Sequence, residues 1–199
     1  MTKHDEMKII RDEVMALTTS PLYDYRTSND YLPVIGEGSH DADIVFIGEA
    51  PGRNEAQTGR PFAGAAGKIL DELLASIEIP RTDVYITNIV KDRPQENRDP
   101  SPEEIAIYGP FLDRQLEIIK PQVIATLGRY SMEYIMKKYD LDLELEPISK
   151  AHGKRYTADD GTIIIPLYHP AAAIYNRSLI DTLKDDFMQL SEFKNEHNT

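Results

Sequence analysis

The sequence predicts an α/β fold, a three-layer α/β/α sandwich around a central, mostly parallel, four-stranded sheet. Four short apolar runs recur along the chain, and amphipathic helical patterns lie between them. Apolar strands that alternate with helices are typical of a parallel sheet covered on both faces. The chain has 199 residues, of which 41% are hydrophobic, so it can bury one sizeable core, and we expect a single domain over residues 1–199.

The first half of the chain contains two predicted helices and two predicted strands. Apolar residues at helical spacing predict a helix over residues 5–17, and a loop-like stretch over residues 18–31 follows it. The run DIVFIG predicts a strand over residues 43–48, and VYITNIV predicts another over residues 84–90. Between these strands an apolar stripe predicts a helix, and the stripe consists of Ile69, Leu70, Leu73, Leu74 and Ile77.

The second half repeats this alternation. Ser101, Pro102 and Glu104 form a capping box with proline in the first turn, which predicts the start of a long helix. Strands are predicted over residues 123–128 and 162–168, with a shorter helix over residues 130–138 between them. A last helix carries its apolar residues on one side, and these are Leu179, Leu183, Phe187, Leu190 and Phe193.

Polar segments rich in glycine or proline follow the four predicted strands. Ligands of open parallel sheets bind beyond the carboxyl ends of the strands, so we expect the functional site in these segments. They are residues 48–52, 88–98, 128–131 and 169–177.

Composition excludes several kinds of site. The chain has no cysteine, which rules out disulfides, thiolate nucleophiles and any metal or cluster held by cysteine. Its five histidines show no metal-binding spacing, and we expect no cofactor. No apolar run is long enough to span a bilayer, and the charged N-terminus is unlike a signal peptide. We therefore expect a cytoplasmic monomer with no membrane association.

The net charge of −12 counts against a nucleic-acid partner, because DNA-binding domains usually present a basic face. The distribution of charge weakens this objection. Residues 147–158 and 161–180 contain no acid, whereas they contain several basic residues. The acids gather instead in residues 140–146 and from residue 181 onward, where a solvated surface is the simplest interpretation.

The glycine-rich segment GEAPGRNEAQTGRPFAGAAGK, over residues 48–68, carries the most specific pattern. A phosphate-binding loop fails, because Phe62 stands where that motif needs glycine and Ile69 follows the lysine instead of serine or threonine. The segment resembles the first motif of family 4 uracil-DNA glycosylases. The resemblance continues through residues 85–98, 110–128, 152–154 and 167–170, and it covers roughly residues 30–177 with the motifs in the family's order.

This resemblance implies a pocket that reads uracil flipped out of DNA. Asn88 would hydrogen-bond the Watson–Crick edge, Phe62 would stack on the base, and the backbone of Ala50 would contact it. Glu55 falls where the family narrows the pocket beside uracil C5, which would reject thymine by its methyl group. Taken alone, Asn88 would be a turn residue, Phe62 a core residue and Glu55 an exposed loop residue.

The resemblance also implies the catalytic groups. His169 would donate a hydrogen bond toward uracil O2 as negative charge develops on the departing base, although His-Pro by itself suggests a structural turn. Glu49 would stabilise the positive sugar and position the attacking water. Lys68 and Lys91 could form a Schiff base with the sugar, but nothing near them in the sequence predicts the lowered pKa required, so we expect a monofunctional enzyme.

Uracil-containing DNA is the partner that the resemblance implies. Ala173 and Ile174 would form a wedge that enters the minor groove and fills the gap left by the flipped nucleotide. The other expected DNA-binding residues are Gly128, Arg129, Lys154, Arg155 and Arg177.

Family 4 members usually bind a four-iron, four-sulfur cluster through four cysteines, and this chain has other residues at those positions. They are Leu17, Ser20, Asp92 and Tyr108. No standard cluster can form on these side chains. We expect Leu17 and Tyr108 to pack together, with Ser20 and Asp92 at the solvent edge of the patch.

Two alternatives to uracil excision stay open at this point. One is a glycosylase of the same fold for another deaminated base, such as hypoxanthine or xanthine. The other is a non-catalytic nucleic-acid-binding module that has lost its cluster. The second predicts a decayed pocket, yet Glu49, Phe62, Asn88 and His169 are all present.

Overall fold

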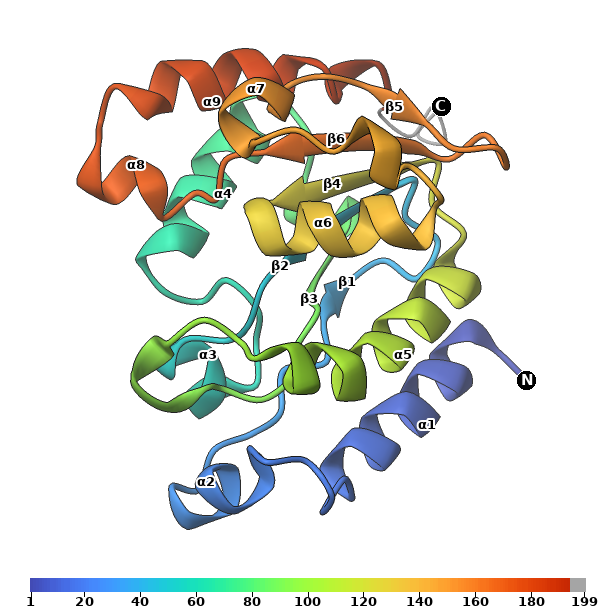
Figure 1. Cartoon of the computed structure of the whole chain (residues 1–199), viewed down its shortest axis with the longest axis vertical. Coiled ribbons are helices and arrows are strands. Elements are labelled where there is room, and N and C mark those ends of the chain that lie inside the picture. Colours follow the sequence, from blue (N-terminus) through green and yellow to red (C-terminus); the bar gives the residue numbers. More distant parts are fainter. Residues whose placement is uncertain (194–199) are drawn as a thin grey trace.

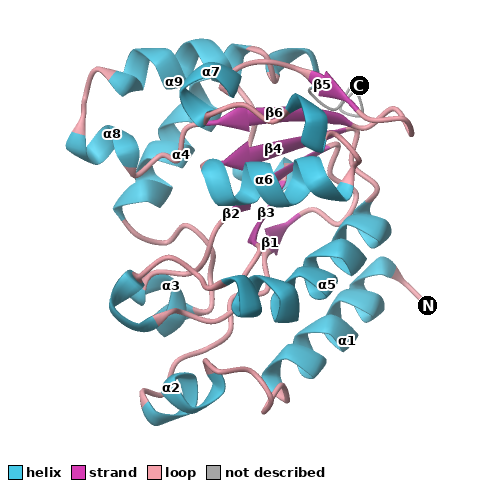
Figure 2. Cartoon of the chain, in the orientation of Figure 1, coloured by secondary structure: helices cyan, strands magenta, loops and turns pink. Residues whose placement is uncertain are grey.

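The computed structural model describes residues 1–193, and a six-stranded sheet forms its centre (Figures 1 and 2). The strand order is β1-β3-β2-β4-β6-β5. The four inner strands pair in parallel, which confirms the predicted strands and the α/β class. They are β2 (Ile44–Gly48), β3 (Tyr85–Asn88), β4 (Val123–Leu127) and β6 (Ile163–Leu167).

Two short edge strands complete the sheet, so the prediction of four strands was too low. β1 (Glu37–Gly38) pairs antiparallel with β3, and β5 (Tyr156–Thr157) pairs antiparallel with β6. A strand of two residues is too short to show an alternating pattern, and its pairing depends on a partner distant in the sequence. The pattern of apolar runs therefore predicts the inner strands and misses the edges.

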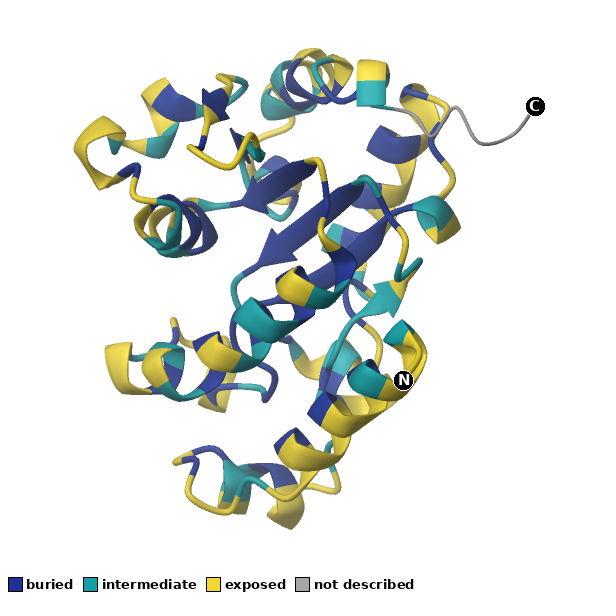
Figure 3. Ribbon diagram, turned by 90° about the vertical axis from the view of Figure 1, so that its right-hand side faces the viewer, coloured by how far each residue is buried: buried dark blue, intermediate teal, exposed yellow. Residues whose placement is uncertain are grey.

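Helices cover both faces of the sheet, as the sequence predicts. Residues of β2 alternate between two cores: Val45 and Ile47 pack on one side, and Ile44 and Phe46 on the other. The first core is covered by α1 (Lys3–Met15), α5 (Pro102–Ile119) and α6 (Arg129–Lys138). The second is covered by α4 (Ala65–Ser76) and α9 (Leu179–Met188). Figure 3 shows the strands buried between these layers.

Short helices and turns occupy the connections. The stretch expected to be a loop over residues 18–31 contains α2 (Tyr23–Ser28), which has no side-chain cap to mark it in the sequence. The other short α-helices are α3 (Arg53–Thr58), α7 (Ile148–Ala151) and α8 (Ala172–Tyr175). The 3₁₀ turns are Arg81–Asp83, Gln95–Asn97, Asp142–Glu144 and Ser191–Phe193. Among residues 1–193, no helix has the length and apolar character needed to cross a membrane.

Candidate active site

The segments after the four inner strands all begin at the carboxyl end of the parallel sheet, which in Figure 1 faces the left side, between α8 and α3. This follows from the parallel pairing, because parallel strands present their carboxyl ends together. The loop after β2 supplies Glu49 and Phe62, the end of β3 supplies Asn88, and the loop after β6 supplies His169.

Asn88 is the last residue of β3 and lies opposite Gly48 of β2. A Cβ atom on Gly48 would lie 2.3 Å from Asn88 Oδ1 and 3.0 Å from the Phe62 ring. Glycine at this position therefore leaves the space that the Asn88 amide and the Phe62 ring share. The Asn88 residue is 2% exposed, and its amide has no hydrogen-bond partner within residues 1–193. An amide without a protein partner is available to bind a polar ligand.

Hydrogen bonds to the main chain around Phe62 fix the position of its ring. Phe62 has a left-handed backbone, with φ of 48°, and Arg81 donates to the carbonyls of Pro61 at 2.6 Å and of Phe62 at 3.3 Å. Gly67 passes so close that a Cβ would lie 1.7 Å from the Phe62 oxygen. The ring stacks on the His169 ring with 5.6 Å between centroids. The structure thus brings together the predicted stacking residue and the predicted donor.

The His169 imidazole has a defined tautomer. Ala171 N–H donates to His169 Nδ1 at 3.1 Å, so the ring proton of the neutral form lies on Nε2. Burial lowers the pKa of His169 to about 4, against a smaller opposing effect of the Glu55 charge. At neutral pH the side chain is therefore an uncharged donor whose Nε2–H has no protein acceptor in the described chain.

Glu49 lies half-buried at the same carboxyl end of the sheet. Burial, followed by the nearby charge of Asp99, raises the pKa of Glu49 to about 7, while Arg129 acts in the opposite direction. Within residues 1–193 no hydrogen bond satisfies its carboxylate. A carboxyl group in this state can exchange between acid and base near neutral pH.

Glu55 has a more defined contact than the sequence indicates. Its Oε1 accepts hydrogen bonds from the backbone of Ala63 and Gly64, both at 3.0 Å, where α4 begins. Glu55 is thus not a free loop residue, and its place beside the base stays a prediction. It fixes the loop that carries Phe62. Ala50 is half-buried, and its side chain packs against the core.

The segment after His169 presents an exposed tip, but Ala173 is not part of it. Ala173 is 2% exposed and packs in the core beside α9, so the expectation that it enters DNA is wrong for this arrangement. Ile174 is 45% exposed, and Tyr175, which the sequence argument overlooked, is 91% exposed. Arg177 is exposed as well and has no acidic partner in the described residues.

Three of the expected phosphate contacts already have partners. Lys154 pairs with Glu146 at 2.5 Å, Arg155 pairs with Glu192, and Arg129 lies 3.5 Å from Asp99. All three pairs are largely exposed, and such pairs exchange readily with other anions. Gly128 adopts a positive φ of 95°, a backbone conformation that favours glycine, and it lies beside His169.

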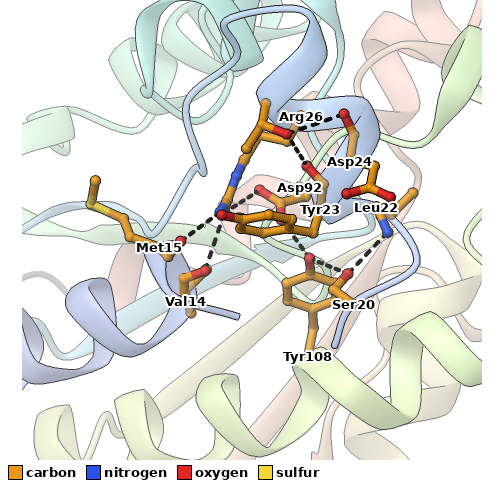
Figure 4. A network of polar contacts seen from close by, with 10 residues as sticks. Val14, Met15, Ser20, Leu22, Tyr23, Asp24, Arg26, Asp92 and Tyr108 are labelled. Carbon is orange, nitrogen blue, oxygen red and sulfur yellow. Dashed lines mark hydrogen bonds and ion pairs between the residues drawn. The ribbon is translucent and has the colours of Figure 1, made fainter. Parts of the chain in front are cut away.

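A buried hydrogen-bond network joins three of the four positions where the family has cysteine (Figure 4). Tyr108 donates to Asp92 at 2.5 Å, and Ser20 lies 2.7 Å from the Tyr108 hydroxyl. Arg26 donates to both Asp92 oxygens at 3.2 Å and to the carbonyls at the end of α1. The network therefore ties residues 14–26 to the loop after β3 and to α5.

The expectation that Ser20 and Asp92 lie at a solvent edge is wrong, because they are 5% and 1% exposed. Burial still raises the pKa of Asp92, but the hydrogen bond from Tyr108 and the charge of Arg26, which that expectation omitted, both act against this and favour the carboxylate. Leu17 is half-buried against the core that contains Tyr108. These side chains do not fit a cluster, because they offer no thiolate and already occupy the space with bonds to one another.

The two lysines considered as nucleophiles differ. Lys68 is exposed on α4. Lys91 is 0% exposed, and burial lowers its pKa to about 7, so the expectation that nothing lowers a lysine pKa is wrong for this residue. Its amine nonetheless cannot reach a sugar, because it is enclosed and bonded to three protein oxygens.

Comparisons with known proteins agree with this geometry. The family model of the uracil DNA glycosylase superfamily matches residues 35–192. A type-4 uracil-DNA glycosylase of Sulfurisphaera tokodaii is 44% identical over 192 residues, which cover 94% of this chain and 84% of the relative. The type-4 enzyme of Archaeoglobus fulgidus is 45% identical, with coverage of 90% and 89%. That of Thermotoga maritima is 43% identical, with coverage of 89% and 88%.

Proposed function

This chain belongs to the uracil-DNA glycosylase superfamily, and we propose that it hydrolyses the N-glycosidic bond of uracil extruded from DNA, leaving an abasic site. The observation that carries the proposal is that the side chains of Asn88 and Phe62 meet beside Gly48 and that the Phe62 ring stacks on the His169 ring. The names of the relatives favour uracil over another deaminated base.

Base recognition follows from the groups that the pocket leaves unmatched. The Asn88 amide offers one acceptor and two donor hydrogens, which fits uracil N3–H and O4. Cytosine presents an acceptor and a donor at the same two places, so it mismatches an amide held in this orientation. The Phe62 ring offers the apolar face on which the base stacks. We also propose that the loop fixed by Glu55 narrows the pocket against the methyl group of thymine.

Bond cleavage separates charge, with electrons moving onto the base while the sugar becomes cationic. The neutral His169 donates from Nε2–H to uracil O2 as negative charge develops there, and it needs no proton from solvent to do so. The ionised Glu49 carboxylate stabilises the cationic sugar and orients the water that attacks C1′. Lys91 is enclosed and cannot attack the sugar, and we propose that the reaction ends at the abasic site without cleavage of the strand.

We propose that DNA rests on the exposed tip of α8, with Ile174 and Tyr175 as the groups that fill the vacated stack and Arg177 on a phosphate. Arg129, Lys154 and Arg155 then exchange their acidic partners for phosphates. We further propose that the protein acts as a monomer in the cytoplasm, where its DNA substrate lies. Light scattering on a size-exclusion column tests the monomer.

The test of the activity is incubation with a labelled oligonucleotide that contains one uracil, followed by alkali, which cleaves abasic sites. We expect cleavage with the unaltered chain and a strong loss with His169→Ala and Asn88→Ala. Oligonucleotides with cytosine, thymine or hypoxanthine in place of uracil should stay intact. Absence of any product from the unaltered, folded protein would overturn the proposed function.

A further inference from the structure

Lys91 is a buried cation for which the reaction above has no use. It follows β3 by three residues and is 0% exposed. Its Nζ donates to Thr87 Oγ1 at 2.8 Å, to the Asn88 carbonyl at 2.7 Å and to Gln115 Oε1 at 2.6 Å. No carboxylate pairs with it among the described residues. A buried charge with neutral partners is unfavourable, so its presence calls for a role.

The three partners of Lys91 all require a hydrogen from it. The Thr87 hydroxyl makes its shortest bond as a donor to the Ile35 carbonyl, at 2.7 Å, so its oxygen is left to accept. The Gln115 amide nitrogen donates to Ile35 and to Tyr85, which leaves its oxygen as an acceptor as well. With the Asn88 carbonyl this makes three acceptors, and an ammonium group has three hydrogens. An uncharged amine would leave one acceptor unmatched.

The hydrogen bond from Lys91 Nζ to the Asn88 carbonyl occupies a position where a longer β1 would have paired with β3. On one side, the main chain at this point is fixed by the β2 ladder, where Ile89 N–H donates to the Gly48 carbonyl at 3.1 Å. On the other side, the register of β1 reaches only Tyr85 and Ile86. The Asn88 carbonyl therefore has no strand neighbour there, and its shorter hydrogen bond comes from the Lys91 ammonium at 2.7 Å, while the Thr87 hydroxyl lies 3.5 Å away.

We propose that Lys91 is a positioning residue for uracil recognition, which holds the Asn88 main chain so that the unmatched Asn88 amide faces the base. Within residues 1–193 the amide has no hydrogen bond of its own, so its direction depends on the backbone that carries it and on the space beside Gly48 and Phe62. Small displacements of such a group have large effects on rate. The inference rests on the proposed function.

A double-mutant cycle tests the proposal, with Lys91→Met, Asn88→Ala and the pair compared by kcat/KM for uracil release. Met replaces the ammonium by an apolar chain of similar length. We expect Lys91→Met to lower kcat/KM by roughly 10- to 100-fold in the unaltered background. In the Asn88→Ala background, Lys91→Met should lower kcat/KM by less than about 3-fold, because the amide that Lys91 positions is absent. Equal losses in the two backgrounds would overturn the proposal.

A second cycle covers the case in which Lys91→Met does not fold. Thr87→Val keeps the side-chain shape and removes one acceptor of Lys91, whereas Thr87→Ser keeps the hydroxyl. We expect a loss with Thr87→Val that again disappears beside Asn88→Ala, and near-normal activity with Thr87→Ser. Lys137→Met, at an exposed lysine of α6, controls for the loss of a charge.

Urea unfolding sets conditions in which every variant is folded. An inactive unaltered chain would defeat the proposed function before either cycle is measured. If the unaltered chain is active but the effects of the paired mutations simply add, the proposed role of Lys91 is wrong and the proposed function still stands.

Discussion

Two buried polar clusters lie about the loop after β3, and they differ in how far their groups are satisfied. In the network of Ser20, Arg26, Asp92 and Tyr108, each side chain bonds to another member (Figure 4). In the pocket, the side chains of Asn88 and Glu49 have no such bond among the described residues. Polar groups that are hydrogen-bonded to one another stabilise the fold, whereas polar groups without a protein partner are available to bind a ligand. Mutations in the two clusters should therefore affect different measurements.

The largest expected effect is on stability, from Asp92→Ala. It leaves Arg26, which is 5% exposed, as a buried charge without a counter-ion. We expect the free energy of unfolding to fall by about 3–5 kcal/mol, measured by urea denaturation. Asp24→Ala, at an exposed carboxylate of α2, is the control and should change it little. A loss for Asp92→Ala below about 1 kcal/mol would mean that the network contributes little to the fold.

The next effect is on rate, from His169→Ala. Removing one oriented donor from a developing charge typically lowers kcat by about 10²- to 10³-fold. The fold should lose less stability than in Asp92→Ala, since the change removes the stacking on Phe62 and one hydrogen bond to the Ala171 backbone but leaves no unpaired buried charge. Single-turnover kinetics beside a urea titration measure both quantities, and His4→Ala, at an exposed histidine of α1, is the control. If His169→Ala lowers the free energy of unfolding as strongly as it lowers kcat, the pocket and the buried network do not differ in the way proposed.

Tyr108→Phe removes one hydroxyl from the network and keeps the ring. The change leaves Ser20 and Asp92 each short of a bond, so we expect a loss of about 1–3 kcal/mol in the free energy of unfolding. Tyr23→Phe is a matched control, because the Tyr23 hydroxyl has no hydrogen bond within residues 1–193. Uracil release by the folded Tyr108→Phe protein should be unchanged. A selective loss of activity would show that the network also acts on the pocket.

The last effect joins stability and rate at one residue, Glu49. Its folded pKa of about 7 lies above the ordinary value of 4.5, so the folded state binds more protons between these limits and stability falls as pH rises through that window. Ionisation in the same window raises the rate, about tenfold per pH unit below 7. At pH 8, Glu49→Gln should therefore be inactive yet more stable, by about 1 kcal/mol after screening by solvent. A flat rate between pH 5 and 7 would exclude Glu49 as the titrating group.

The sequence predicts the parts of this molecule that depend on repeated local signals. The four inner strands and the capped helix at Ser101 each carry an apolar run or a cap that is visible in a single stretch of chain. The carboxyl-end location of Asn88 and His169 follows from parallel pairing. The two-residue edge strands and α2 carry no such signal.

Contacts between distant residues were the harder part to predict. Arg26 meets Asp92 across 66 positions, and nothing around either residue marks the pairing. Without that partner, solvent was the natural environment to expect for Asp92. Ala173 was misplaced for a related reason, since the turn of α8 that buries it depends on packing against α9. Asp99, whose charge helps to raise the Glu49 pKa, lies in an ordinary loop sequence.

Leu17, Ser20, Asp92 and Tyr108 stand where the family has four cysteines, and this difference changes what the protein needs from the cell. Assembly of this region requires no iron, sulfide or loading machinery, because the chain itself supplies every atom of the network. Peroxide and superoxide dismantle exposed iron–sulfur centres and oxidise thiolates. This sequence contains no cysteine for them to attack. Oxidative stress also increases damage to DNA bases. The folding of this region is thus independent of the metal supply that the same stress disturbs.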